Sequence, residues 1–224
     1  MKPKGWGSTA GRIAFWSPVL ITVVLAAAQT VEHEPEREHW QELGQIFRAM
    51  AVGPGSVVAD VGAGDGFLSV RLAPLVGEKG RVYAEDIAEG RLGRLRKRIA
   101  DAHLDNIVVV AGLANDPRLP IAQLDSVVIL NSYHEMPEYD EMLRRILDAL
   151  KPGGRLVIAE PSPAAGEQTR AQQTAKHHIG SVFVAEELAH AGFIMIETHD
   201  NFAQTPDGGH YSLVMGRRAV KPLA

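Results

Sequence analysis

Three glycines at alternate positions stand where a buried strand should be followed by a helix. They are Gly62, Gly64 and Gly66, directly after the valine-rich run 56–61. Such a turn lets the backbone approach a ligand closely and directs helix N-terminal amides at an anionic group. A dinucleotide fingerprint would place its third glycine at the position of Phe67. The turn alone predicts a close backbone approach, and a tight turn without a ligand stays open as an alternative.

An acidic pair, Glu85–Asp86, lies about 20 residues further along, at the end of the next predicted strand. A carboxylate there can accept hydrogen bonds from both hydroxyls of a ribose. Asp86 could equally cap the helix that follows. Together, the glycine turn and the carboxylates favour a nucleotide-like ligand over a purely structural turn.

A polar segment, 131–135, follows the predicted fourth strand, where open α/β sheets bind their ligands. Asn131 could line a cofactor pocket. Tyr133 and His134 could orient or deprotonate a substrate, because an unperturbed histidine titrates near neutrality. Packing or capping is the alternative for both. Glu160, at the end of the fifth strand, could likewise act on a substrate or serve only in packing or capping.

His177 and His178 precede the last predicted helix. With His134, His199 and His210 they could in principle form an imidazole site. Adjacent histidines point in different directions on most backbones, however, and no histidine or carboxylate recurs at a ligand-like interval. We therefore predict no metal site and expect the pair to line the substrate pocket, to cap the helix or to be solvated.

Strands and helices alternate at the spacing of parallel βαβ units, which predicts an α/β fold with helices on both faces of a sheet. The predicted strands span 56–61, 81–84, 107–111, 126–130, 155–159, 193–199 and 211–216. The predicted helices span 34–52, 67–76, 88–102, 139–150 and 181–191, with a glycine-rich turn at 151–154. About a dozen residues without a helix join the last two strands, so an antiparallel final pair is expected.

Composition restricts the class of protein further. The net charge is −4, and it falls to −7 without the three basic residues in the first dozen. No basic stripe is present, which argues against nucleic acid as a partner. The absence of cysteine excludes disulfides, thiolate metal sites and cysteine nucleophiles.

The first 28 residues have the layout of a signal peptide: a basic start, an apolar run from Ile13 to Ala28, and small residues at its end. The run is about 16 residues, shorter than the roughly 20 of a spanning helix. We expect a cleaved signal peptide and export to the periplasm or beyond. An uncleaved anchor, associating with a membrane through this segment only, is the alternative, and a cytoplasmic location is less favoured. The domain would span 29–219, with 29–52 as a helical lead-in.

Four segments resemble those of the class I S-adenosylmethionine-dependent methyltransferases: VADVGAGDG (58–66), VYAEDI (82–87), LDSVVILNSYHEM (124–136) and LKPGGRLVIAEP (150–161). The resemblance runs from about Pro35 to Arg218 and is closest to the small-molecule branch, which includes quinone and other C- or O-methyltransferases. It implies a Rossmann-like, doubly wound seven-stranded sheet in the order 3-2-1-4-5-7-6, mostly parallel with an antiparallel last strand.

The resemblance also implies S-adenosyl-L-methionine as cofactor and assigns its contacts. The glycine turn would cradle the methionine portion, Asp60 would hold its amino group, and Asp86 would bind the ribose. The family often has an acidic residue directly after the third strand to contact adenine, where this chain has Leu113. Asn115 or Asp116 could substitute for that acid, and Asn131 could line the pocket. The full implied cofactor-binding set is Asp60, Gly62, Ala63, Gly64, Gly66, Asp86, Asn115, Asp116 and Asn131.

These features predict a methyltransferase that acts on an unidentified small molecule, with Tyr133 and His134 as candidate catalytic residues. Methyl transfer from a sulfonium is an in-line displacement, so a base is needed only for a protonated nucleophile. One alternative is a non-catalytic cofactor-binding or sensing protein that retains the fold, which an exported location favours. An NAD(P)-linked oxidoreductase is disfavoured by Phe67 and by the turn at 151–154.

Overall fold

The computed structural model describes residues 34–164 and 166–220. The predicted signal peptide or anchor, 1–28, lies outside the described residues. Within them, no helix combines the length and the apolar character that crossing a bilayer requires. Contacts divide the chain into a unit of residues 1–37 and a unit of residues 38–224. The sheet and the candidate site belong to the second unit.

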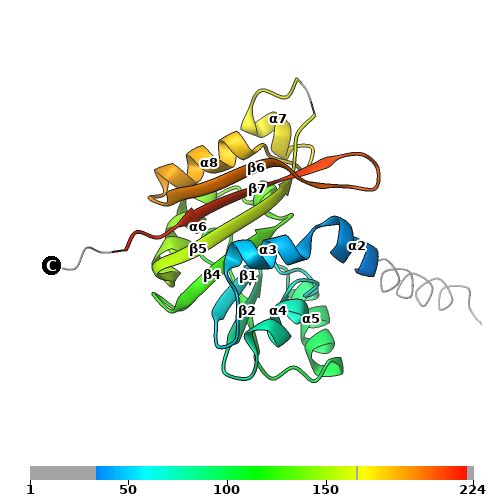
Figure 1. Cartoon of the computed structure of the whole chain (residues 1–224), viewed down its shortest axis with the longest axis vertical. Coiled ribbons are helices and arrows are strands. Elements are labelled where there is room, and N and C mark those ends of the chain that lie inside the picture. Colours follow the sequence, from blue (N-terminus) through cyan, green and yellow to red (C-terminus); the bar gives the residue numbers. More distant parts are fainter. Residues whose placement is uncertain (1–33, 165, 221–224) are drawn as a thin grey trace, which may run out of the picture. The chain divides into compact units, whose positions relative to one another are not determined.

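One seven-stranded sheet forms the centre of this unit, in the order β3-β2-β1-β4-β5-β7-β6 (Figure 1). Neighbours among β1 to β5 pair in parallel, and β7 pairs antiparallel with both β5 and β6. The predicted order and the antiparallel final pair are thus confirmed. The strands are β1 (Val57–Val61), β2 (Arg81–Asp86), β3 (Ile107–Ala111), β4 (Leu124–Leu130), β5 (Leu150–Pro161), β6 (Ile194–Gln204) and β7 (His210–Arg217).

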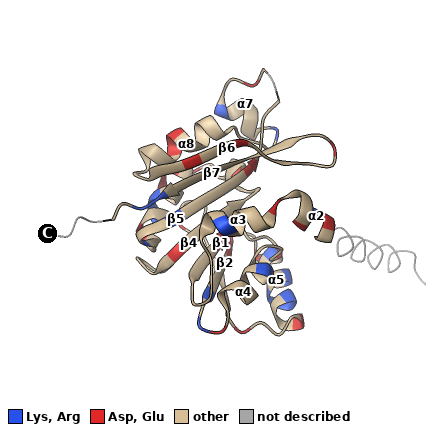
Figure 2. Cartoon of the chain, in the orientation of Figure 1, with Lys and Arg blue, Asp and Glu red and all other residues tan. Residues whose placement is uncertain are grey.

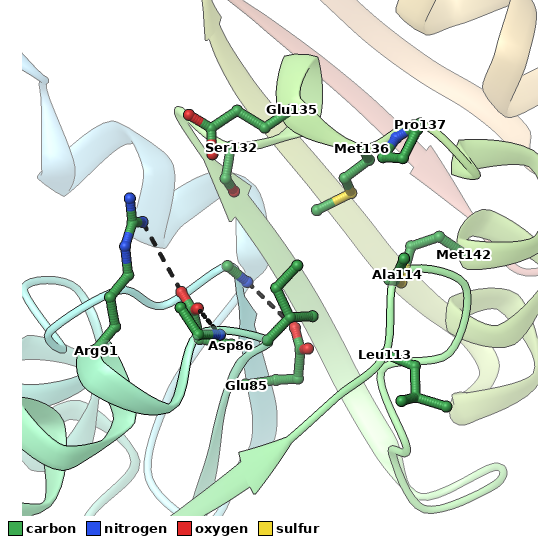
Figure 3. Close-up of a pocket in the computed structure, with 13 residues that line it drawn as sticks. Glu85, Asp86, Arg91, Leu113, Ala114, Ser132, Glu135, Met136, Pro137 and Met142 are labelled. Atoms are coloured by element: carbon green, nitrogen blue, oxygen red, sulfur yellow. Dashed lines mark hydrogen bonds and ion pairs between the residues drawn. The ribbon is translucent and has the colours of Figure 1, made fainter.

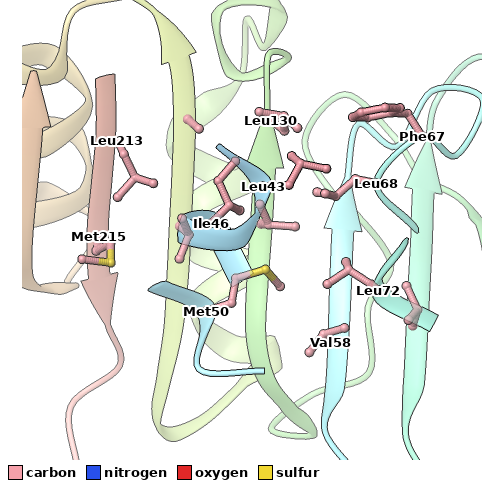
Figure 4. Close-up of a cluster of buried hydrophobic side chains, with 14 of the residues drawn as sticks. Leu43, Ile46, Met50, Val58, Phe67, Leu68, Leu72, Leu130, Leu213 and Met215 are labelled. Carbon is pink, nitrogen blue, oxygen red and sulfur yellow. The ribbon is translucent and has the colours of Figure 1, made fainter. Parts of the chain in front are cut away.

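Helices pack on both faces of the sheet. The described helices are α2 (Glu34–Trp40), α3 (Leu43–Met50), α4 (Ser69–Val76), α5 (Glu89–Asp101), the 3₁₀ turn η1 (Tyr133–Glu135), α6 (Tyr139–Ala149), α7 (Arg170–Thr174) and α8 (Ser181–His190). Alternate β1 residues face opposite ways: Val58 joins the core of α3 and α4 (Figure 4), whereas Ala59 joins that of α6 and α8. Each large apolar side chain buried in these cores contributes about 1.5–3 kcal/mol.

The predicted single helix over 34–52 is wrong, because the chain breaks between α2 and α3. Glu42 adopts a left-handed conformation with φ of 53°. The break lets the ring of Trp40 pack edge-on against Tyr211, with centroids 5.6 Å apart. The apolar side of α3 still packs in the core through Leu43, Ile46 and Met50. Periodicity could not show the break, because the apolar spacing is helical on both sides of it.

The predicted turn at 151–154 lies inside β5 rather than before it. The pairing of β4 with β5 shifts register here, between Leu124 and Ser126. Gly153 has φ of +81°, and a Cβ on Gly154 would lie 2.9 Å from the Lys151 carbonyl oxygen. The two glycines therefore permit an irregularity in a strand that is longer than the predicted 155–159. β5 also extends to Pro161, which places Glu160 within it.

Positive charge gathers along α5 (Figure 2). Leu92 and Leu95 are the buried residues of this helix, and its basic side chains point away from the core. Two of them pair with acidic residues of the same helix: Arg96 with Glu89 and Lys97 with Asp101, both at 2.6 Å. Such exposed pairs contribute about 0–1 kcal/mol each. Most of this face is a solvated helix surface.

Candidate cofactor and active site

A pocket of about 230 Å³ opens where β1, β2 and β4 end (Figure 3). Parallel strands bring their carboxyl ends to one edge of the sheet, which is where ligands of open α/β folds bind. The pocket is lined by Gly62, Glu85, Asp86, Ile87, Ala88, Arg91, Leu113, Ala114, Ser132, Glu135, Met136, Pro137 and Met142.

The Asp86 carboxylate is held at the end of β2 by backbone amides. Its Oδ2 accepts a hydrogen bond from the Gly64 N–H at 2.9 Å, and its Oδ1 accepts one from the Ala88 N–H at 2.8 Å. The Arg91 guanidinium lies 4.0 Å away. Each carboxylate oxygen can accept a further hydrogen bond. Asp86 thus ties the glycine turn to the β2–α5 connection and presents acceptors to the pocket. The capping alternative is wrong, because the N-cap of α5 is Ala88 and no side chain caps this helix.

Glu85 is a buried acid with one unsatisfied oxygen. The side chain is 2% exposed, its Oε2 accepts a hydrogen bond from the Gly62 N–H at 3.3 Å, and its Oε1 has no partner among the described residues. Burial raises the Glu85 pKa to about 8, with smaller contributions from the charges of Asp86, Asp60 and Asp116, while the Gly62 N–H opposes the rise. The carboxyl is therefore mostly protonated at neutral pH and can donate a hydrogen bond.

Each of the three glycines in the turn has a positive φ, but a Cβ would meet different neighbours at each position. A Cβ on Gly62 would lie 2.3 Å from the Ser132 hydroxyl oxygen, and one on Gly66 would lie 2.4 Å from Leu95 Cδ1. A Cβ on Gly64 would meet only Arg91 Nη1, at 3.9 Å. Packing inside the protein thus accounts for Gly62 and Gly66. At Gly64 the space beside the backbone is not filled by protein, which fits a ligand that approaches the main chain.

Only Gly62 and Asp86 of the predicted cofactor set line the pocket. Asp60 is buried and accepts a hydrogen bond from the Ser69 hydroxyl at 2.6 Å. Asn131, with φ of 55°, accepts one from the Tyr211 hydroxyl at 2.9 Å. The others outside the lining are Ala63, Gly64, Gly66, Asn115 and Asp116, the last of which bridges to the backbone of Leu113.

His134 is buried in η1, next in the chain to the lining residue Glu135, and is not itself one of the residues that line the pocket. Its Nδ1 lies 2.5 Å from Glu160 Oε2, and Glu160 Oε1 accepts hydrogen bonds from the Ser132 and Tyr133 N–H groups at 2.8 and 2.7 Å. Burial alone lowers the His134 pKa, but the hydrogen bond and charge of Glu160 and the charge of Glu135 raise it above its ordinary value. Because a carboxylate only accepts hydrogen bonds, Nδ1 carries a proton. The ring is therefore fixed in orientation.

Tyr133 points into the core rather than into the pocket. Its hydroxyl donates to Glu187 Oε2 at 2.6 Å, and Arg170 pairs with the other oxygen of Glu187 at 2.7 Å. Burial, with the charge and hydrogen bond of Glu187, raises the Tyr133 pKa far above its usual range. This placement matches the packing alternative and does not bring the phenol to the pocket.

Several lining residues were not predicted from the sequence. Ser132, Glu135 and Met136 lie in the predicted polar segment or next to it, so their proximity could have been anticipated. Arg91 belongs to a basic helix face that the sequence assigned to solvent rather than to an anion site, whereas the structure places it in the pocket lining, within the first turn of α5. Met142 is an ordinary apolar residue of α6 in the sequence, and nothing there indicates that it reaches the pocket.

Comparison with known proteins identifies the family. A methyltransferase domain model matches residues 53–207. The chain belongs to this family of S-adenosylmethionine-dependent methyltransferases, as the four sequence segments predicted. That assignment fixes the class of cofactor and favours it over the nicotinamide-dependent alternative.

Curated relatives share part of the chain. The demethylmenaquinone methyltransferase of Listeria monocytogenes is 30% identical over 118 residues, covering 53% of this chain and 50% of the relative. The ubiquinone/menaquinone biosynthesis C-methyltransferase of Vibrio cholerae is 31% identical over 128 residues, covering 56% and 49%. The matched region thus spans about half the length of these relatives.

Solved structures share the fold. A methyltransferase of Aquifex aeolicus aligns with a TM-score of 0.70 at 22% identity, over 82% of this chain and 93% of that chain. A phosphoethanolamine N-methyltransferase of Haemonchus contortus, in complex with S-adenosyl-L-methionine, aligns with a TM-score of 0.65 at 16% identity, over 80% and 52%. The Rossmann-like seven-stranded architecture is therefore confirmed.

Proposed function

We propose that this chain transfers a methyl group from S-adenosyl-L-methionine to a small-molecule acceptor. The observation that best supports this proposal is the pocket at the carboxyl ends of β1, β2 and β4, in a domain of the methyltransferase family. The cofactor supplies an electrophilic methyl group on a positively charged sulfur. The protein's own residues bind, orient and shield the two reactants, which is where most of the rate of such a displacement arises.

Residues of the pocket fit this cofactor chemically. Asp86 would accept hydrogen bonds from the ribose hydroxyls. Gly64 is outside the lining but adjoins the lining residues Asp86 and Arg91, and the unfilled space beside it would admit the methionine portion. Ile87 and Leu113 line the pocket although they are 64% and 45% exposed. Covering such apolar side chains with a flat ring is favourable, which suits the adenine. The unsatisfied oxygen of Glu85 offers a polar contact from the pocket floor.

The acceptor would enter beside η1, where Glu135 lines the pocket and His134 is buried next to it. His134, oriented by Glu160, would orient the acceptor or remove its proton if the nucleophile carries one. The relatives' names support a small ring compound of the quinone type as the first acceptor class to test. Asp60 and Asn131 would act behind the pocket, by holding the turn and the end of β4.

We further propose that the catalytic domain spans 29–219 and that residues 1–28 direct export or anchor the chain. Support for this comes from the basic start and apolar run of the sequence alone. Fractionation of cells that produce the full chain, followed by N-terminal sequencing, tests the proposal. Recovery of an intact N-terminus in the cytoplasmic fraction would overturn it.

Transfer of labelled methyl groups tests the proposed function. The purified protein is incubated with methyl-labelled S-adenosylmethionine and either a demethylated quinone or small-molecule fractions of cell extract. We expect label in a small-molecule product. If the protein binds the cofactor but labels no fraction, transfer is refuted and the non-catalytic binding alternative is favoured.

A further inference from the structure

Three side chains with metal-binding atoms meet at the edge of the cofactor pocket. They are His134 and Glu135 of η1 and His177, which follows α7. Their ligand atoms all lie within 4.8 Å of one another. The sequence predicted no metal site, because adjacent histidines diverge on most backbones and no histidine or carboxylate recurs at a ligand-like interval. The fold brings the three side chains together, because α7 packs against η1.

His134 already has the surroundings of a metal ligand. Its Nδ1 is engaged by the buried carboxylate of Glu160, so Nε2 is the ring nitrogen that faces the cluster. Nε2 lies 3.8 Å from Glu135 Oε1, in the cluster. Histidines that bind metals almost always donate their other ring N–H to a carboxylate or carbonyl, which fixes the tautomer and the ring direction. Here two backbone N–H groups also hold the orienting carboxylate in place.

His177 completes the cluster from a strained backbone position. Its φ is 60°, in the left-handed region that residues other than glycine rarely adopt. Its Nδ1 lies 3.9 Å from Glu135 Oε1, and its ring is 5.6 Å from the His134 ring at 85°. The side chains of His177 and Glu135 are 78% and 50% exposed. Packing therefore does not fix either of them, and strain of this kind often marks a functional position.

We propose that His134, Glu135 and His177 bind a divalent transition-metal ion, with water at the remaining positions. Two imidazoles and one carboxylate suit Zn²⁺ or Fe²⁺, whereas Mg²⁺ and Ca²⁺ prefer oxygen ligands. Bonds of about 2.1 Å at tetrahedral angles set ligand atoms about 3.4 Å apart. The distances of 3.8 and 3.9 Å from Glu135 Oε1 to the two histidine nitrogens would shorten to that value through small rotations of the exposed Glu135 and His177 side chains.

The position of this site connects it to the reaction. Glu135 lines the cofactor pocket as well as the cluster, so a bound ion would lie at the pocket's edge. An open coordination position there would hold an oxygen of the acceptor in place. With Nδ1 on Glu160 and Nε2 on the ion, His134 would orient the acceptor through the ion and would not remove its proton. This consequence rests on the proposed function, whereas metal binding itself does not.

Titration with Zn²⁺ alone tests the site. The tag-free protein, stripped with chelator and dialysed, is titrated calorimetrically without cofactor, and Co²⁺ is then substituted as a spectroscopic probe. We expect one ion per chain and a visible absorption band typical of nitrogen and oxygen ligands. Absence of Zn²⁺ binding by the folded wild-type chain would overturn the proposal.

Variants locate the ion. His177→Ala removes an exposed ligand and should weaken Zn²⁺ binding by at least about tenfold. His103→Ala is the matched control, because His103 is also an exposed histidine with a left-handed φ, of 52°. Equal affinity in the two variants would refute the assignment. Circular dichroism checks folding, and cofactor titration of the same samples separates failure of the metal site from failure of the proposed function.

Discussion

Replacing Glu85 by glutamine should make the protein more stable at neutral pH. The carboxyl is 2% exposed, one oxygen lacks a partner, and its pKa is raised from 4.5 to about 8. The folded chain therefore keeps a proton that the unfolded chain releases above about pH 4.5. The free energy of unfolding consequently decreases as pH rises from about 4.5 to about 8. Glutamine has the same shape and no charge, so it removes this dependence.

The size of the effect follows from the interval between the two pKa values. Each pH unit in that interval lowers the free energy of unfolding by up to about 1.4 kcal/mol. Between pH 4.5 and pH 7 the loss is about 3 kcal/mol, and it grows by about a further 1 kcal/mol up to pH 8. Against a typical domain stability of about 5–15 kcal/mol, this is readily measured. The two proteins should be nearly equal in stability at pH 4.5.

Urea unfolding of the cofactor-free proteins at several pH values between about 4.5 and 8.5 measures the difference. Glu89→Gln serves as the control, because the Glu89 side chain is 75% exposed. It should follow the pH dependence of the wild type. Parallel curves for wild type and Glu85→Gln would refute the reasoning, as would a Glu85→Gln variant less stable than the wild type at pH 7.

Two further predictions concern the candidate catalytic residues. Tyr133→Phe should lower the free energy of unfolding by about 1–3 kcal/mol, because it removes the hydroxyl that donates to buried Glu187. Thermal melts and cofactor titration check this, and weakened cofactor binding with unchanged stability would contradict the core placement. His134→Ala should leave the dissociation constant for S-adenosylmethionine unchanged and reduce turnover by about 10²–10⁴-fold if His134 acts as a base. Unchanged turnover would remove it from the mechanism.

Much of the sheet could be predicted from local pattern. A strand buried on both faces requires a continuous apolar run, so β1 was found close to its observed bounds. A similar run identified β3, although this strand lies at the edge of the sheet and is only partly buried. The connection from β6 to β7 carries no helix, which was enough to predict an antiparallel pair. The strand order came from the resemblance, because the runs themselves do not say which strands are neighbours.

The helix break and the site depended on contacts that the sequence does not display. The chain changes direction at Glu42, close to the ring contact between Trp40 and Tyr211 of β7. Glu85 was evident as half of an acidic pair, but its burial and unsatisfied oxygen arise from neighbours on other strands and loops. A Cβ on Gly112 would overlap Glu85 Oε1, so this glycine makes room for the side chain.

The cluster of His134, Glu135 and His177 is a second arrangement that the sequence pattern does not display. From the sequence, His134 was considered together with His177 and His178, and the directions of adjacent histidines and the lack of a ligand-like interval argued against a metal site. His177 reaches His134 through the packing of α7 on η1, and Glu160 orients the His134 ring from β5. Short-range spacing identifies ligand sets carried on one helix or loop. It does not identify a set assembled from separate elements, here η1 and the segment after α7.

Calorimetric titration with S-adenosyl-L-methionine measures whether this chain binds the cofactor and whether the space beside Gly64 is needed for binding. The account predicts that the wild type binds at tens of micromolar or tighter and that Gly64→Val abolishes binding, since the side chain would occupy the space left open for the ligand. Gly77→Val, at a glycine with a similar φ of +66° and no atom within 4 Å of its Cβ position, should retain affinity. No binding by the wild type, or unchanged affinity in Gly64→Val, would contradict the account.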